Sequence, residues 1–360
     1  MLFHKIPELI KEIRLGNLII LMDDAKRENE GDFVMAAKYV KPEHINFMIS
    51  HGKGLLCMPI TKKRCKQLNL PLMTMNSNNK FNTNFTVSIE SSKGITTGIS
   101  AFDRFVTIQA AIKKNAKPKD IIQPGHIFPI MAKNGGVFSR AGHTEASCDL
   151  VRLAGFEPSA VLIEILSKNG HMARYPELRK ISKKFNIKIG TISDLIQYRI
   201  KNENTMKCIF QNQLKTKWGI FKLKCYLDKI HNIFHIVLLK GKVLKEKTYP
   251  IKIYYQNTIN DIISIMHSQN KNLYKNVESF SNRSYGIIFI IGDEKKSKQD
   301  IIKNLQFFIK NIKFPIELNS NYQKNISIVR ILYQLGIKKI HLLNNKENFS
   351  FFSNFGISIQ

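Results

Sequence analysis

The sequence predicts a protein of two α/β domains, of which the first is a layered α/β (α+β) domain with a mixed sheet. The chain has 360 residues, enough for two domains that each bury a core. Short apolar runs alternate with amphipathic segments as far as residue 201, and the pattern changes from residue 202 onward. We therefore place the domains at 1–201 and 202–360.

The predicted elements of the first domain follow from periodicity and from start and stop residues. Apolar residues at helical spacing predict a first helix that ends at Gly16, Pro42 starts another, and Gly155 stops a third. We interpret Ser100 and Ser193 as helix caps. In chain order the predicted strands are 17–22, 33–40, 54–61, 85–90, 159–166 and 187–191, and the predicted helices are 6–15, 42–50, 102–113, 144–154, 174–186 and 193–201.

The second domain shows fewer clear elements. Apolar runs predict strands at 218–227, 234–240 and 285–292, and a last strand that reaches residue 343. Helical spacing predicts helices at 298–312 and 326–335, the latter followed by Gly336.

Composition limits the classes of function. No uncharged apolar run approaches the roughly 18 residues of a membrane span, and the amphipathic N-terminal segment is unlike a signal peptide. We therefore expect a cytoplasmic protein without membrane contact. The five cysteines include no CxxC or CxC spacing, which indicates neither a disulfide framework nor a thiolate zinc site.

The net charge of +29 is spread along the chain, with +13 in residues 1–200 and +16 in residues 201–360. There is no arginine-rich tail, and the abundance of Lys, Ile and Asn is typical of AT-rich coding. We do not interpret this charge as a nucleic-acid footprint, although a polyanion-binding or regulatory module in residues 202–360 stays open as an alternative.

The most informative segment is the loop from Asp23 to Asp32, which holds five carboxylates and two cations. Carboxylates this crowded repel one another unless a cation neutralises them. Oxygen ligands of this kind suit Mg²⁺ or Mn²⁺ better than zinc or copper. The segment therefore predicts a divalent-metal site, with a solvated polar turn as the alternative.

Four further segments carry polar groups suited to a site. Residues 94–104 combine glycines with hydroxyls such as Thr97, and His126 lies beside a glycine in PGHIFP. Residues 135–146 lead into a predicted helix start, where free N–H groups, Arg140 and the Thr144 hydroxyl favour an anion such as a phosphate. Glu164 interrupts an apolar strand, which makes it a candidate general acid or base.

Taken in order, RENEGD, TTGISAFDR, PGHIFP and RAGHTE resemble the motifs of 3,4-dihydroxy-2-butanone 4-phosphate synthase, an enzyme of riboflavin biosynthesis. The resemblance implies a three-layer synthase domain in a homodimer. It implies a lyase that converts D-ribulose 5-phosphate to L-3,4-dihydroxy-2-butanone 4-phosphate and formate, with one or two Mg²⁺ or Mn²⁺ ions and no zinc.

The resemblance also assigns roles to residues of this chain. Glu28 and His143 are the expected metal ligands, and His126 and Glu164 are the expected catalytic residues. The expected substrate-binding residues are Arg27, Glu28, Asp32, Arg140, Ala141, Gly142, His143, Thr144 and Glu164. Asp23, Glu30, Cys57 and Thr97 are further candidates.

Residues 202–360 resemble GTP cyclohydrolase II through the order of elements and the closing LGIKKIHLLNN. That family holds zinc with three cysteines, whereas this half contains only Cys208 and Cys225. We expect a degenerate, smaller α/β domain retained for packing or regulation. The alternative is a bifunctional enzyme that also hydrolyses GTP.

Overall fold

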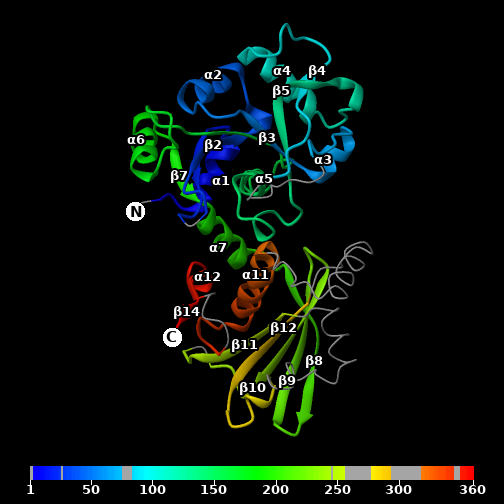
Figure 1. Ribbon diagram of the computed structural model, residues 1–360, viewed down its shortest axis with the longest axis vertical. Helices are drawn as coiled ribbons and strands as arrows, with labels where there is room; N and C mark the ends of the chain where they lie inside the picture. The colour runs from blue at the N-terminus through cyan, green and yellow to red at the C-terminus, as the bar shows by residue number, and fades with distance from the viewer. Residues whose placement is uncertain are drawn as a thin grey trace, which may run out of the picture. The chain divides into compact units, whose positions relative to one another are not determined.

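The computed structural model describes residues 3–25, 27–74, 83–244, 246–255, 277–292, 318–343 and 349–360. Contacts divide the chain into a first unit, Met1–Tyr198, and a second unit, Arg199–Gln360. The division falls within helix α7 (Ile192–Asn202), whose last residue begins the predicted second domain. Each unit contains one mixed seven-stranded sheet (Figure 1).

The sheet of the first unit has the strand order β4-β5-β3-β6-β2-β1-β7. β3 runs parallel to β5 and β1 runs parallel to β7, whereas the pairs β1–β2, β2–β6 and β4–β5 are antiparallel. Its strands are β1 (Ile19–Met22), β2 (Gly31–Ala36), β3 (Cys57–Thr61), β4 (Ile89–Ser91), β5 (Ile121–Ala132), β6 (Ala160–Glu164) and β7 (Lys188–Thr191). Its helices are α1 (Ile6–Leu15), α2 (Pro42–His51), α3 (Lys62–Gln67), α4 (Ala101–Ile112), α5 (His143–Leu153) and α6 (Tyr175–Phe185).

Helices cover both faces of this sheet, so the unit has the three layers expected (Figure 1). Alternate strand residues such as Ile20 and Phe33 join a core with residues of α2, α4 and α6. The residues between them, Leu21 and Asp32 among others, face the layer that holds α1 and α5. The site described below lies on this second face.

Local details differ from the sequence prediction at two places and agree with it at a third. The strand predicted at 33–40 begins at Gly31 and ends at Ala36, so Asp32 belongs to the sheet rather than to the loop. Ser100 caps α4, as predicted, by accepting a hydrogen bond from the N–H of Asp103. The cap of α7 is Thr191 rather than Ser193, because the Thr191 hydroxyl accepts the N–H of Asp194 at 3.0 Å.

The second unit has the sheet order β14-β13-β11-β12-β10-β9-β8. The structure contains the strands predicted near 218–227, 234–240 and 285–292, and it adds strands that the sequence reading missed. Its elements are β8 (Met206–Thr216), β9 (Gly219–Asp228), β10 (Ile233–Lys240), β11 (Tyr249–Tyr255), β12 (Gly286–Ile291), α11 (Leu318–Leu335), β13 (Lys339–Leu342), α12 (Phe349–Ser353) and β14 (Ser358–Ile359). The helix predicted at 298–312 lies outside the described residues.

A buried ion pair joins α11 to the end of β9. Arg330 donates to both carboxylate oxygens of Asp228, at 2.9 and 3.0 Å, and His231 lies 2.8 Å from the same carboxylate. Hydrogen bonds from these two side chains hold the pKa of Asp228 well below its usual range, against the effect of burial. The second unit therefore has a structural charge pair of its own.

Candidate active site

The loop between β1 and β2 folds around Asp23. This carboxylate is buried and accepts hydrogen bonds from the backbone N–H groups of Glu28, at 3.0 Å, and Glu30, at 2.8 Å. The loop backbone closes on itself, since the N–H of Asp23 donates to the carbonyl of Glu30. Asp23 thus shapes the turn that presents Glu28. These backbone hydrogen bonds give the Asp23 carboxylate a structural role even when no metal ion is bound.

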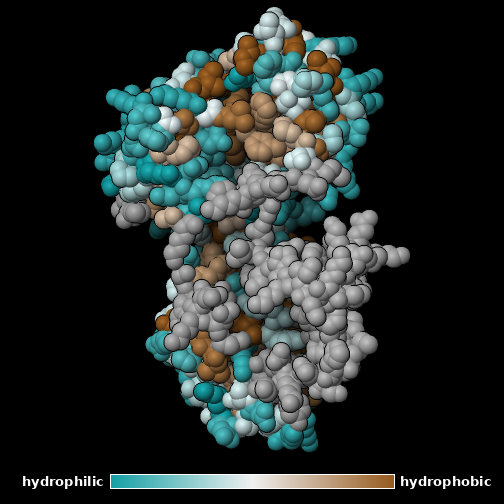
Figure 2. Space-filling view, viewed as in Figure 1, coloured by the Kyte–Doolittle hydropathy of each residue, from teal (hydrophilic) through white to brown (hydrophobic). Residues whose placement is uncertain are grey.

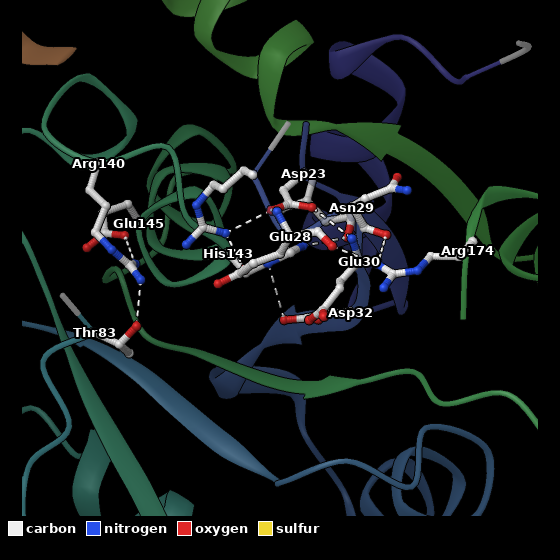
Figure 3. A network of polar contacts seen from close by, with 12 residues as sticks. Asp23, Glu28, Asn29, Glu30, Asp32, Thr83, Arg140, His143, Glu145 and Arg174 are labelled. Carbon is white, nitrogen blue, oxygen red and sulfur yellow. Dashed lines mark hydrogen bonds and ion pairs between the residues drawn. The ribbon is translucent and has the colours of Figure 1, made fainter. Parts of the chain in front are cut away.

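Two arginines, Arg27 and Arg174, neutralise part of the negative charge of the loop, and Figure 3 shows the second of them beside it. Arg27 donates to Asp23 at 2.9 Å and also pairs with Glu28. Arg174, which precedes α6, donates to the backbone carbonyls of Glu28, at 2.6 Å, and Asn29, at 2.5 Å. Arg174 therefore fixes the loop from the far side, and the sequence reading did not identify it, because nothing in its local sequence points to residues some 145 positions away.

His143 reaches the same place as the first residue of α5. Its Nε2 lies 3.1 Å from the carbonyl oxygen of Leu21, which can only accept, so the proton sits on Nε2 and the Nδ1 lone pair is left available. Burial lowers the pKa of His143 to about 4, which keeps the ring neutral near pH 7. A neutral ring with a free nitrogen lone pair is the form that binds metals.

Asp23, Glu28 and His143 each offer one ligand atom, and these atoms lie within 4.8 Å of one another. Figure 3 shows the three side chains converging from the loop and from the start of α5. Of the expected ligands, Glu28 and His143 are thus brought together from segments more than 110 residues apart, with Asp23 as a third candidate.

Asp32 and Glu164 lie beside this group on neighbouring strands. They are direct partners in the β2–β6 register, and Leu21 of β1 pairs with Asp32 on its other side. Burial raises the pKa of Asp32 well above its usual range, and the negative charge of Glu164 is the second largest cause. Burial also raises the pKa of Glu30. The predicted strand 159–166 is shorter in the structure, because β6 ends at Glu164, and the carboxylate of this residue accepts the N–H of Leu55 at 2.8 Å.

A divalent cation fits this arrangement. One carboxylate oxygen of Asp32, Oδ1, is buried and has no hydrogen-bond partner among the described residues, which is costly for a polar atom and would be relieved by a cation. Asp32 Oδ2 lies 3.8 Å from His143 Nδ1. Carboxylates and one neutral imidazole form a donor set that a hard divalent ion accepts.

The segment predicted to bind an anion lies at the same end of α5. Gly142 is the N-cap, and the first turn of the helix leaves N–H groups without helical partners. Arg140 donates to Glu145 at 2.7 Å and to Thr83 at 2.7 Å (Figure 3). A Cβ atom at Gly142 would lie 2.3 Å from Arg140 Nη1, so this glycine allows the guanidinium to fold across the helix start.

Ala141 and Thr144 complete the segment, the latter buried in the first turn of α5. Glu145, which sequence reasoning did not select, is nearly fully buried and also accepts the N–H of Lys133 at 3.0 Å. Its spacing of five residues from Arg140 across a helix start is the signal that could have identified it.

Three predicted residues make no hydrogen bond or ion pair with the group around His143 in the part of the chain that the structure describes. His126, on β5, pairs instead with Glu90 of β4. Thr97 is exposed in the turn before α4. Cys57 begins β3, and its burial raises the pKa of the thiol, with the charges of Glu164 and Asp32 acting in the same direction. The thiol therefore stays protonated, which disfavours a role as a nucleophile.

The fold and these groups define a two-unit α/β protein whose first unit carries a candidate divalent-metal site next to an anion-binding helix start. Comparison with known proteins assigns the chain to a family. The sequence pattern of the 3,4-dihydroxy-2-butanone 4-phosphate synthase family matches residues 7–198, and that of the GTP cyclohydrolase II family matches residues 207–360. The chain belongs to the 3,4-dihydroxy-2-butanone 4-phosphate synthase family.

Relatives match along the whole chain. A 3,4-dihydroxy-2-butanone 4-phosphate synthase of Pseudomonas aeruginosa is 41% identical over 359 residues, which cover 100% of this chain and 98% of the relative. The riboflavin biosynthesis protein RibBA of Aquifex aeolicus is 38% identical and covers 99% of this chain, with 91% of its own length matched.

Solved structures agree with the fold. RibBX, a two-domain 3,4-dihydroxy-2-butanone 4-phosphate synthase from A. baumannii, matches with a TM-score of 0.72 and 38% identity over 99% of each chain. A 3,4-dihydroxy-2-butanone 4-phosphate synthase in complex with two magnesium ions matches with a TM-score of 0.54 and 37% identity, over 56% of this chain and 99% of its own.

Proposed function

We propose that the first unit converts D-ribulose 5-phosphate to L-3,4-dihydroxy-2-butanone 4-phosphate and formate, the riboflavin-pathway step of a carbon–carbon lyase. The observation that carries this proposal is the meeting of Asp23, Glu28 and His143 within 4.8 Å, next to the helix start of α5. Family membership over residues 7–198 supports it independently.

Arg140, Ala141, Gly142 and Thr144 bind the phosphate of the substrate in this proposal. The guanidinium and the free N–H groups of the first helical turn supply donors and positive charge at one place. Phosphate anchored there directs the sugar toward Arg27 of the acidic loop and toward Asp32 and Glu164, which pair with each other on strands β2 and β6.

Glu164 and His126 transfer protons, and their surroundings suit the task in different ways. The Glu164 carboxylate accepts one backbone hydrogen bond, from Leu55, and keeps further acceptor capacity. The His126 side chain is 44% exposed, so its ring is accessible to a substrate.

Glu28 and His143 hold a divalent ion, with Asp23 and Asp32 beside them. The two magnesium ions in the related structure support Mg²⁺, and Mn²⁺ and a second ion are further parts of the proposal. When bound, the ion supplies Lewis-acid stabilisation of negative charge on the sugar oxygens. We propose no zinc, because the cluster offers two carboxylates and one imidazole, and oxygen-rich donor sets suit Mg²⁺ or Mn²⁺ better.

We further propose a homodimer formed through the first unit, in the cytoplasm. Several large apolar side chains of this unit are exposed, among them Leu55, Met73, Ile99, Phe102 and Ile122. Figure 2 shows apolar side chains gathered over the region of α2, α4 and β5. Such an accumulation is typical of an interaction surface. No helix among the described residues has the length and apolar character to cross a membrane.

We also propose that the second unit retains the fold of GTP cyclohydrolase II but does not hydrolyse GTP. Its sequence contains only Cys208 and Cys225, on the neighbouring strands β8 and β9, whereas the family's zinc site needs three cysteines. The RibBA relative is the reason to test the bifunctional alternative, and the charge of +16 in residues 201–360 is the reason to test polyanion binding.

One experiment tests the main proposal. The full chain is incubated with D-ribulose 5-phosphate and Mg²⁺, with and without chelator, and formate is measured. We expect metal-dependent formate release, and unchanged release with chelator would refute the metal assignment. Parallel incubation with GTP and Zn²⁺ is expected to give none, and formate from GTP would establish the bifunctional alternative. Titration with single-stranded RNA at increasing salt tests polyanion binding.

A further inference from the structure

His126 and Glu90 form a second polar pair in the first unit, away from the metal-site candidates. Glu90 lies on β4 and His126 on the neighbouring strand β5, and Oε1 of the carboxylate is hydrogen-bonded to Nδ1 of the ring. The Glu90 side chain is 13% exposed, whereas that of His126 is 44% exposed. The carboxylate therefore lies behind the ring, and the ring faces solvent.

This arrangement selects one tautomer of the neutral ring. An ionised carboxylate can only accept a hydrogen bond, so Nδ1 must carry the proton. Nε2 is then left with its lone pair on the exposed side of the ring. The same relation between a carboxylate and an imidazole orients the histidine of hydrolytic triads, where the carboxylate acts through the ring and never touches the substrate.

The turn at residues 96–98 packs closely against the Glu90–His126 pair and is itself held by hydrogen bonds. Asp103 accepts hydrogen bonds from Thr96, through its N–H at 3.1 Å and its hydroxyl at 2.8 Å, and from the N–H of Gly98 at 3.0 Å. A Cβ atom at Gly98 would lie 1.6 Å from Glu90 Oε1 and 2.7 Å from His126 Nδ1. Only a glycine lets this turn approach both partners so closely. The φ of Gly98, +87°, also lies in the left-handed region that favours glycine.

The register of the sheet places His126 within range of the main site. Phe128, two residues after His126, pairs with Cys57 of β3, and Cys57 pairs with Leu162 of β6. Two residues beyond Leu162 lies Glu164, at the same end of the sheet as His126. With strands spaced by about 4.8 Å, the two positions are separated by roughly 10 Å.

We propose that Glu90 is a positioning residue for this reaction: it fixes His126 as the Nδ1–H tautomer, so that Nε2 serves as the proton acceptor for the sugar phosphate. The inference rests on the proposed function for its substrate, but the tautomer it assigns is a property of the free protein. Glu90 acts only through the imidazole.

The test compares Glu90→Ala and Glu90→Asp with His126→Ala and with a matched control, Glu157→Ala, whose carboxylate side chain is 58% exposed. Ring ¹⁵N chemical shifts assigned through His126→Ala report the tautomer. We expect the Nδ1–H form in the wild type and in Glu90→Asp, and its loss in Glu90→Ala. For turnover, we expect Glu90→Ala to lower kcat by about 10- to 100-fold, the usual effect of removing an orienting partner, with KM nearly unchanged.

The outcomes separate the two proposals. Retention of the Nδ1–H form or of full kcat in Glu90→Ala overturns the positioning role. Absence of formate from the wild type refutes the proposed function, while the ring ¹⁵N shifts still decide the tautomer. A Mg²⁺-dependent increase in melting temperature, measured for each variant, shows that the first unit remains folded, because Glu28 and His143 belong to segments other than the β4–β5 pair.

Discussion

Replacing Glu28 by Gln is the sharpest test of the metal site. The side chain keeps its volume and an acceptor for Arg27, but the cluster loses one of its anionic ligands. A ligand present at 100 times its dissociation constant stabilises the native state by about 2.7 kcal/mol. If the substitution weakens Mg²⁺ binding 100-fold, the same concentration contributes only about 0.4 kcal/mol.

The assay is thermal unfolding of the full chain with chelator and with Mg²⁺. For a unit of this size, about 1 kcal/mol corresponds to roughly 2–4 °C in Tm. We therefore expect Mg²⁺ to raise the wild-type Tm by roughly 5–11 °C and that of Glu28→Gln by less than about 2 °C. Equal Mg²⁺-induced shifts in both proteins would refute the assignment of Glu28 as a ligand, as would formate release by the variant at the wild-type rate.

Three further outcomes are expected. His143→Ala removes the only imidazole of the cluster, and isothermal titration should show Mg²⁺ affinity reduced at least about 10-fold. Arg140→Ala removes a charge-assisted donor worth about 1.5–3 kcal/mol, so steady-state kinetics should show kcat/KM for the sugar phosphate lowered by roughly 10- to 150-fold. Asp228→Asn leaves the Arg330 charge buried without its counter-ion, which should destabilise the second unit by about 3–5 kcal/mol in urea unfolding. Because the folded pKa of Asp228 is depressed, its contribution is present above the unfolded value of about 3.9 and is lost as pH falls below it, so the variant should show a flatter acid dependence of stability.

Much of the first unit is readable from its sequence because local signals and tertiary packing agree there. Gly16 adopts the left-handed conformation that ends α1, and Ser100 caps α4. Glu164 marks a limit of this agreement, since the sequence predicts a strand that continues to residue 166, whereas β6 ends at Glu164.

The misses have a common physical cause, which is that partners far away in the chain decide the outcome. Arg174 holds the acidic loop through backbone carbonyls, and Glu90 meets His126 only because β4 pairs with β5. Strand β8 was missed because nearly every side chain along it is exposed, so no alternation of apolar and polar residues marks it.

The hydrogen bond from His143 to Leu21 spans 122 positions of the chain. A fragment that ends before α5 keeps every carboxylate of the acidic loop and yet lacks the nitrogen donor and the strand β6. In such a nascent chain the carboxylates of the acidic loop repel one another, and His143 is not yet present to complete the proposed metal site. At the proposed site, acquisition of the ion would therefore be a late event in the folding of this unit, and retained Mg²⁺ would report that its long-range topology has formed.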